Sequence, residues 1–291
     1  MAQRKFPVLV ATDGSPQARV AVETAVAFPW PPGSTGHGVV ARGTPVLTDA
    51  SPDLWEALLE VGRAEARRAE GRLRQRWPDA EVVVTDAPPV LGILARARKV
   101  RARVIVLGSR GLGAVGRLFL GSVSRTVVRR APCSVLVARG AARDPSRFLL
   151  GVDGSPHARG AVAFVSGLRP RRGGRAHLLR VVEPVRPPST GLMPARVRAL
   201  LTREATELER EHVAAARREL ETAGARLAKA GWRVKIEVRM GRPLEELLAA
   251  SKDADVLVVG ARGVGAIERL LLGSVAEGAV TRAAVPVLVV R

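Results

Sequence analysis

Residues 104–139 read VIVLGSRGLGAVGRLFLGSVSRTVVRRAPCSVLVAR, and residues 256–291 read VLVVGARGVGAIERLLLGSVAEGAVTRAAVPVLVVR. Nearer the start of the chain, VLVATDGSPQARVAV (8–22) is matched by LLGVDGSPHARGAV (149–162). The earlier pair is offset by 140 residues and the later pair by 152, so the second copy holds 12 extra residues in its middle. Similarity of this length, at two places in the same order, is the signature of an internal duplication.

The duplication divides the 291-residue chain into two domains. Each copy has close to the roughly 100–150 residues of a typical domain. The polar stretch ARGAARDPSR (138–147), which contains Pro145, separates the copies. We therefore predict a first domain over residues 1–140 and a second over residues 146–291.

Each copy alternates apolar runs with helical segments. In the first copy FPVLVA begins the domain as a buried parallel strand would, and Ser15 followed by Pro16 indicates a helix start. The remaining strands of this copy are expected at 38–42, 81–85, 103–108 and 134–139. The second copy repeats the order with a longer helix over roughly 195–230. Strands separated by helices imply right-handed crossovers, so the predicted fold class is α/β, with two tandem doubly wound domains.

The segment after the fourth strand of each copy is the strongest functional signal. It follows the pattern G-x2-G-x9-G-S in both copies, through Gly108, Gly111, Gly121 and Ser122 and through Gly260, Gly263, Gly273 and Ser274. Glycines let the backbone come close to a ligand, and the final Gly-Ser lies where the N–H groups of a helix start favour an anion. The serine hydroxyl could cap the helix or donate to phosphate, and Arg110 and Arg262 could reach phosphate oxygens. The pattern predicts a phosphate-binding loop in each copy, at the carboxyl ends of the strands.

Other interpretations of these glycines are weaker. Gly111 to Gly116 matches the dinucleotide fingerprint G-x-G-x-x-G, but the second copy has Glu268 at the third glycine. The loop also follows the fourth strand rather than the first, and no acidic residue opens a strand about 20 residues later. A G-x-x-x-x-G-K-[ST] motif is absent from the sequence. Glycines that only form tight turns remain an alternative, which the identical spacing in two copies disfavours.

The net charge of +20 is the one extreme feature of the composition. Such a charge could indicate a nucleic-acid or anionic-membrane partner. Only five of the 47 basic residues are lysines, and many arginines lie at helical spacing from glutamates, as in TREATELEREHVAAARRELE (202–221). Aromatic residues that could stack on bases make up 3% of the chain. We therefore interpret the arginines as a solvated, compositional feature and expect no membrane or nucleic-acid partner.

Several functional classes are disfavoured by what the sequence lacks. No apolar run approaches the ~20 residues of a membrane span, and the N-terminus has no signal-peptide core, so we expect a cytoplasmic protein. Cys133 is the only cysteine, which excludes an intrachain disulfide. The four histidines are scattered without metal-ligand spacing, and we find no nucleophile–base pair. We therefore expect neither a metal centre built by the protein nor an enzyme.

The G-x2-G-x9-G-S loop, the opening D-G-S and the closing V-L-V runs together resemble the universal stress protein family in its ATP-binding branch. The resemblance covers nearly the whole chain, twice. It implies that each domain has a five-stranded parallel sheet of order 3-2-1-4-5 with helices on both faces. It also implies ATP, AMP or ADP at the strand ends and dimers joined along strand five. Asp13 could share a Mg²⁺ ion with the phosphates.

The resemblance also assigns roles to single residues. It places Asp13 and Asp153 near adenine and ribose, Val181 after strand two against adenine, and Gly241 after strand three beside the phosphates. In the first copy the implied nucleotide contacts are Ala11, Asp13, Gly108, Arg110, Gly111, Gly121, Ser122 and Val123. In the second copy they are Gly151, Asp153, Val181, Gly241, Gly260, Arg262, Gly263, Gly273, Ser274 and Val275.

The first copy departs from the family pattern at two places. Its second strand is short and flanked by Gly and Pro, so no adenine partner can be assigned there. Asp86 aligns with Gly241, and a carboxylate close to phosphate would repel it. We therefore expect the second site to bind more tightly than the first.

The function implied by the resemblance is that of a non-catalytic, nucleotide-responsive stress protein. Two alternatives remain open, a slow ATPase or nucleotide-transfer enzyme and a charge-driven nucleic-acid binder. The fifth strands, SVLVAR and PVLVVR, would be exposed apolar edges in separate domains. We expect them to pair within the chain as a pseudo-dimer, and a homodimer of whole chains is also open.

Overall fold

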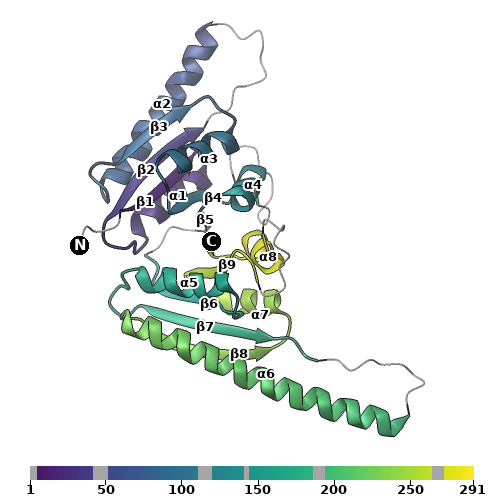
Figure 1. Ribbon diagram of the computed structural model, residues 1–291. Helices are drawn as coiled ribbons and strands as arrows, with labels where there is room; N and C mark the ends of the chain where they lie inside the picture. The colour runs from purple at the N-terminus through teal and green to yellow at the C-terminus, as the bar shows by residue number, and fades with distance from the viewer. Residues whose placement is uncertain (1–4, 42–51, 111–119, 141–143, 186–193, 264–271) are drawn as a thin grey trace.

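The computed structural model describes residues 5–41, 52–110, 120–140, 144–185, 194–263 and 272–291 (Figure 1). The first copy contributes β1 (Phe6–Thr12), α1 (Pro16–Ala27), β2 (Ser34–Ala41), α2 (Pro52–Arg74), β3 (Glu81–Thr85), α3 (Pro89–Lys99), β4 (Val104–Gly108), α4 (Ser122–Arg130) and β5 (Ser134–Ala138). The second copy contributes β6 (Arg147–Gly151), α5 (Pro156–Gly167), β7 (Arg175–Val182), α6 (Ala195–Lys229), β8 (Arg233–Met240), α7 (Pro243–Ala250), the 3-10 turn η1 (Ser251–Asp253), β9 (Val256–Gly260), α8 (Ser274–Arg282) and β10 (Val287–Val290).

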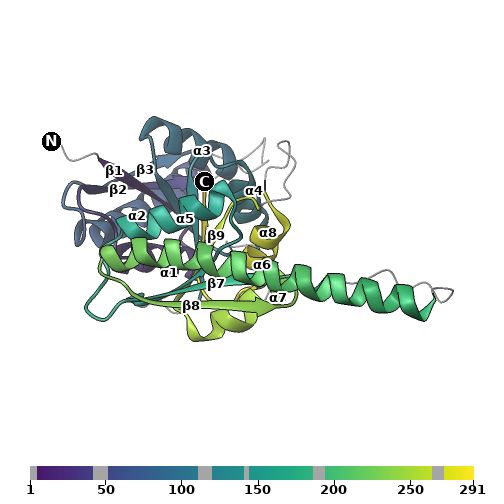
Figure 2. The same cartoon turned by 60° about the horizontal axis from the view of Figure 1, so that its bottom comes forward.

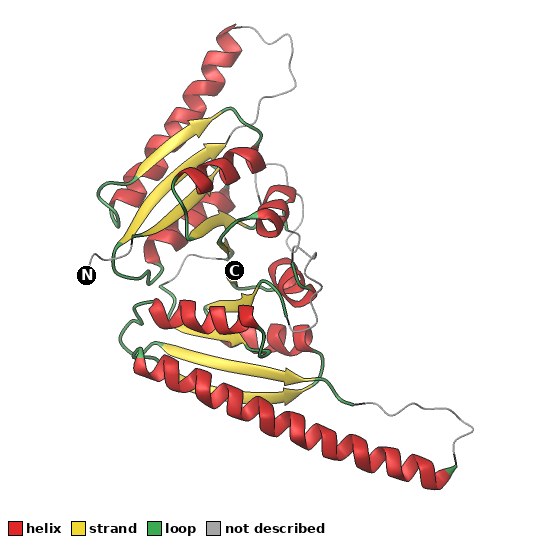
Figure 3. Cartoon of the chain, viewed as in Figure 1, coloured by secondary structure: helices red, strands yellow, loops and turns green. Residues whose placement is uncertain are grey.

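The ten strands form one continuous sheet in the order β3-β2-β1-β4-β5-β10-β9-β6-β7-β8. The first half follows the order 3-2-1-4-5, the second half mirrors it, and neighbouring strands within each half are parallel. The predicted fold class is therefore confirmed, with the addition that the two sheets are joined into one. Figure 3 shows the strands lying between helices.

Helices cover both faces of this sheet. The apolar sides of α1, α2, α5 and α6 pack on one face, where Val22, Leu73, Val162 and Leu220 are buried. The other four helices, α3, α4, α7 and α8, pack on the opposite face. Each layer runs across both copies, so the chain has a shared core on each side of the sheet. Figures 1 and 2 show the first part of α6 extending beyond the sheet.

The two copies meet at their fifth strands. β5 and β10 pair antiparallel through three residue pairs, with Leu136 opposite Leu288 at the centre. This is the pairing of apolar edges that was expected from the sequence. Beside it, Phe28 of the first copy and Phe148 of the second form an edge-to-face pair with ring centroids 5.7 Å apart. Phe6 and Phe164 make a second such contact at 5.9 Å.

One strand differs from its expected bounds. β2 begins at Ser34, four residues before the predicted start at 38. The early part of this strand contains glycines because neighbouring side chains occupy the space of a Cβ. A Cβ on Gly36 would lie 2.3 Å from the Trp77 ring, and one on Gly38 would lie 2.5 Å from Val82. None of the described helices is long and apolar enough to cross a membrane.

Candidate functional site

A cavity of about 710 Å³ opens at the carboxyl ends of β6, β7 and β9 in the second copy. Its volume falls within the ~300–1,000 Å³ typical of small-molecule sites. Most of the residues predicted for this copy line it, namely Gly151, Asp153, Val181, Gly260, Arg262, Gly263, Gly273, Ser274 and Val275. The remaining predicted residue, Gly241, follows β8 and lies outside the lining set, although Pro243 belongs to it. Val181 lines the cavity from within β7 rather than after it.

The D-G-S segment connects the first strand to the glycine loop. The backbone N–H of Ser155 donates to Asp153 Oδ1 at 3.0 Å, which forms a tight turn. Ser155 Oγ accepts from Ala158 N at 3.1 Å, as expected for a cap of α5, and donates to the carbonyl of Arg262 at 3.2 Å. One hydroxyl therefore fixes both the helix start and the loop after β9. The first copy repeats the cap, with Ala18 N donating to Ser15 Oγ at 3.2 Å.

The glycines of the loop differ in what they do. A Cβ on Gly260 would lie 2.8 Å from the backbone of His157, and one on Gly108 would lie 2.7 Å from the backbone of Gln17. These two glycines therefore permit close packing of strand against helix, a role that neither the phosphate-loop nor the tight-turn interpretation assigned to them. Gly273 is less crowded, since among the described residues the nearest heavy atoms to a Cβ there would be Ala261 O and Arg262 Cα, both at 3.4 Å. Its environment leaves room for a ligand.

The start of α8 borders the cavity. Gly273 is the N-cap residue and Ser274 is the first helical residue, with no side-chain hydrogen bond to the cap. Gly121 and Ser122 repeat this arrangement at α4, so the interpretation of either serine as a capping residue was wrong. The first N–H groups of a helix have no partners within it. Because Ser274 and Val275 line the cavity, those groups are available to an anion there.

Two arginines bring unpartnered nitrogens to the cavity. Nε and Nη1 of Arg180, on β7, are buried and have no hydrogen-bond partner among the residues that the structure describes, and the same holds for Nε of Arg262. Arg180 Nη1 lies 3.8 Å from Glu219 Oε2 on α6, which is beyond hydrogen-bonding distance. Buried donors of this kind call for an explanation, and an absent ligand is one.

Sequence reasoning missed Arg180 and Glu219. The contact between these two side chains depends on how α6 crosses β7, and the spacing of apolar residues along the sequence does not reveal that crossing. A signal was nevertheless present, because Glu65 and Glu219 occupy equivalent helices. A Cβ on Gly14 would lie 3.2 Å from Glu65, and one on Gly154 would lie 2.8 Å from Glu219. Aligning the copies through these helices would have identified the acidic position.

The first copy differs at this end of its site. Glu65 is buried, accepts from Thr12 Oγ1 at 2.9 Å and pairs with Arg68 at 3.0 Å. Val40 takes the place of Arg180, since the strand registers align His37 with His177. Ala11 at the end of β1 and Gly108 at the end of β4 are buried, whereas Asp13, Arg110, Ser122 and Val123 are exposed or partly exposed. Gly111 lies outside the described residues.

The alignment of Asp86 with Gly241 was wrong by one residue. Glu81 pairs with His37, and Lys235 pairs with the equivalent His177, so Glu81 corresponds to Lys235. The same offset aligns Asp86 with Met240 and Ala87 with Gly241. It also aligns the first residues of α3 and α7, which are both proline. Asp86 is exposed and no longer provides a reason for unequal sites.

Other titratable groups offer little chemistry. Burial raises the pKa of the Cys133 thiol to about 11, which keeps it protonated at neutral pH. Burial lowers the pKa of His157, and the charge of Arg262 lowers it further. Among the described residues, no group of three or more His, Cys, Asp or Glu side chains is placed to hold a metal ion.

The mirrored sheet and its strand-end cavity define the chain as a tandem α/β protein with a cavity at the carboxyl ends of its strands. Comparison with known proteins identifies the family. The model of the universal stress protein family matches residues 6–139 and again residues 145–291. The chain therefore belongs to the universal stress protein family, as a tandem member with two such domains.

Individual relatives agree with this assignment. Universal stress protein Rv2005c of Mycobacterium tuberculosis is 34% identical over 239 residues, covering 78% of this chain and 73% of that protein. A universal stress protein of Thermus aquaticus is 38% identical over 138 residues, which cover 45% of this chain and 97% of that protein. The crystal structure of a universal stress protein from Archaeoglobus fulgidus superimposes with a TM-score of 0.66 over 99% of both chains at 21% identity. This last similarity concerns the fold alone.

Proposed function

We propose that the chain binds an adenine nucleotide in the cavity of the second copy and acts as a non-catalytic, nucleotide-responsive stress protein. The observation that carries the proposal is the convergence on one cavity of the α8 N-terminus and two arginines with unpartnered nitrogens. These groups would hold phosphates through backbone N–H groups and charge-assisted hydrogen bonds. The resemblance of the glycine loop to the ATP-binding branch supports adenine as the base.

The two ends of the cavity suggest how the ligand would lie. The phosphates would occupy the α8 end, beside Gly263, Gly273 and Arg262. The base and ribose would extend toward the end of β7, where Val181 and Val182 line the wall. Asp153 is the carboxylate beside Gly263 and would be the protein ligand of a Mg²⁺ ion accompanying the phosphates.

Substitution of Gly273 tests the proposal without disturbing the fold. Gly273→Asp places a carboxylate where a phosphate should bind, yet Asp is a favoured N-cap residue. A charge within about 6 Å repels a phosphate charge by roughly 1–3 kcal/mol at an effective dielectric of 20–80. We expect calorimetric titration with ATP to show at least a tenfold loss of affinity, about 1.4 kcal/mol.

Gly273→Asn is the matched control, because it is nearly isosteric with Asp, caps helices equally well and carries no charge. It should bind ATP within about threefold of the wild type, a difference under ~0.7 kcal/mol. Equal binding by the Asp and Asn variants would refute a phosphate at this helix start. The wild-type complex should also hydrolyse no ATP above the rate of the Gly273→Asp variant. A higher, variant-sensitive rate would make the protein a slow ATPase instead.

A further inference from the structure

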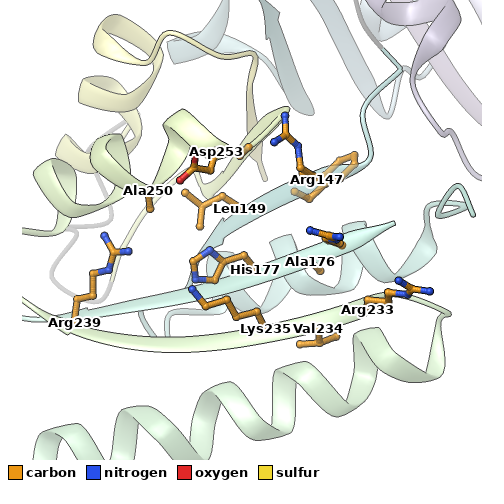
Figure 4. Close-up of a pocket in the computed structure, with 13 residues that line it drawn as sticks. Arg147, Leu149, Ala176, His177, Arg233, Val234, Lys235, Arg239, Ala250 and Asp253 are labelled. Carbon is orange, nitrogen blue, oxygen red and sulfur yellow. The ribbon is translucent and has the colours of Figure 1, made fainter. Parts of the chain in front are cut away.

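A second cavity, of about 360 Å³, lies near the amino ends of β6, β7 and β8 (Figure 4). It opens on the sheet face that α7 covers, and Ala250, Asp253 and Ala254 form its opposite wall. Its lining shares no residue with the candidate nucleotide cavity. The basic side chains among its lining residues are Arg147, Arg175, His177, Arg233, Lys235 and Arg239.

Some of these charges are already neutralised within the protein. Glu237 pairs with Arg239 at 2.6 Å and with Lys235 at 2.7 Å. These hydrogen bonds hold the Glu237 pKa at about 2, so this carboxylate stays charged at all physiological pH values. Arg147 pairs with Asp255 at 2.7 Å.

Arg175 and Arg233 are different. They are exposed and pair with no carboxylate among the described residues. They lie opposite each other in the β7–β8 register, and adjacent strands are about 4.8 Å apart. Because side chains alternate along a strand, both share a face with His177 and Lys235. Arginines at directly opposed positions of adjacent strands place two like charges within reach of one anion, which could bind both.

The first copy shows that the fold does not require these charges. Its residues equivalent to Arg175 and Lys235 are Thr35 and Glu81, by the strand registers. Asp79, two residues before Glu81, corresponds to Arg233. A general excess of arginine would affect both copies alike. The basic residues at these three strand positions are therefore particular to the second copy.

We propose that this cavity is a second anion site, which binds a small molecule carrying at least two phosphate groups. Two groups are proposed because Arg175 and Arg233 each bring a guanidinium group with no carboxylate partner among the described residues, and each can bind one phosphate group. The enclosure by α7 and η1 favours a compact molecule over a nucleic-acid strand. The lining also lacks an exposed aromatic ring on which a base could stack, since its one aromatic residue, Phe148, is 1% exposed.

Inorganic tripolyphosphate is a suitable probe, titrated calorimetrically into the full chain carrying Gly121→Asp and Gly273→Asp, so that the glycine loops of both copies contribute little. We expect one site per chain. Arg175→Thr with Arg233→Asp installs the residues of the first copy, which the fold accepts, and should weaken binding at least tenfold. Arg196→Thr with Arg203→Asp makes the same charge change on exposed positions of α6, outside both cavities, and should weaken binding less than threefold.

Three results would overturn the proposal. The first is no binding of tripolyphosphate at millimolar concentration. The second is an equal loss of tripolyphosphate affinity in the two double variants. The third is a single-stranded RNA that binds more tightly than tripolyphosphate and depends equally on Arg175 and Arg233. Circular dichroism of both variants controls for folding. Tripolyphosphate is measured in a background where the nucleotide cavity is already weakened. A negative result in this titration therefore does not count against the proposed function, and a negative ATP titration does not count against this second site.

Discussion

Arg180 is the residue that most clearly distinguishes the cavity of the second copy from the equivalent region of the first. Its buried Nε and Nη1 have no hydrogen-bond partner in the described part of the chain, and Val40 replaces it in the first copy. Glu219 lies 3.8 Å away and offsets part of its charge. A ligand with a hydrogen-bond acceptor at this end of the cavity would satisfy both nitrogens.

Replacing Arg180 should therefore weaken nucleotide binding. Arg180→Met keeps the length of the side chain but removes its donors, and we expect about a tenfold loss of ATP affinity, about 1.4 kcal/mol. Asp86→Gly serves as the comparison, because Asp86 is exposed and does not correspond to Gly241. It should leave the titration unchanged. Tighter binding by Asp86→Gly would restore the original explanation for unequal sites.

Some residues of the cavity could be predicted from the sequence, and others could not. The loop pattern together with the family resemblance predicted nine lining residues of one cavity, which fits the convergence of strand ends on one edge of a parallel sheet. The role of Gly260 was not predictable, since its contact with the start of α5 depends on packing. The Asp86 alignment failed because the strands between the two matched segments differ in sequence, and only their hydrogen-bond register aligns them.

At the scale of elements, β5 and β10 are each followed directly by an arginine whose side chain caps the end of a helix in the other copy. The Arg139 guanidinium donates to the carbonyls of Val280 and Ala283 at the end of α8. Arg291, at the equivalent position, donates to the carbonyls of Val128 and Arg129 at the end of α4. Carbonyls at a helix end lack partners within the helix, and a cation is favoured there.

Removal of one of these arginine caps should destabilise the folded protein. Burial and, secondarily, the charge of Arg110 lower the pKa of Arg139 to about 10, which still leaves the residue charged at pH 7. Hydrogen bonds to a charged group contribute about 1.5–3 kcal/mol each, and we expect Arg139→Met to lower the free energy of unfolding by about 2–4 kcal/mol. Urea denaturation measures this change. Arg203→Met, on the exposed part of α6, is the control and should change it by less than about 0.5 kcal/mol. Equal midpoints for both variants would show that the cap contributes nothing.

At the scale of the whole molecule, the junction between the copies is a shared core. The sequence has only nine Phe and Trp residues, and six of them gather there, namely Phe6, Phe28, Trp30, Phe148, Phe164 and Trp232. Phe28, Trp30 and Phe148 are at most 1% exposed. The rings and the β5–β10 pairing would face water if the copies separated.

The separated halves should therefore associate. Fragments 1–140 and 146–291 would each expose an apolar strand edge together with an aromatic patch, which favours edge-to-edge pairing. Sedimentation velocity should show dimers or aggregates of each fragment, and a one-to-one complex when the two are mixed. Two fragments that stay monomeric, alone and together, would contradict this account of the junction.

The central claim is that the cavity of the second copy binds an adenine nucleotide with its phosphates at the start of α8. A crystal structure of the full chain with a non-hydrolysable ATP analogue tests it most directly. We predict density for phosphates within hydrogen-bonding distance of the backbone N–H groups that follow Gly273, and contacts from Arg262. We also predict that the base lies toward the end of β7. Density for the analogue elsewhere on the molecule, or an empty cavity at saturating analogue, would contradict the account.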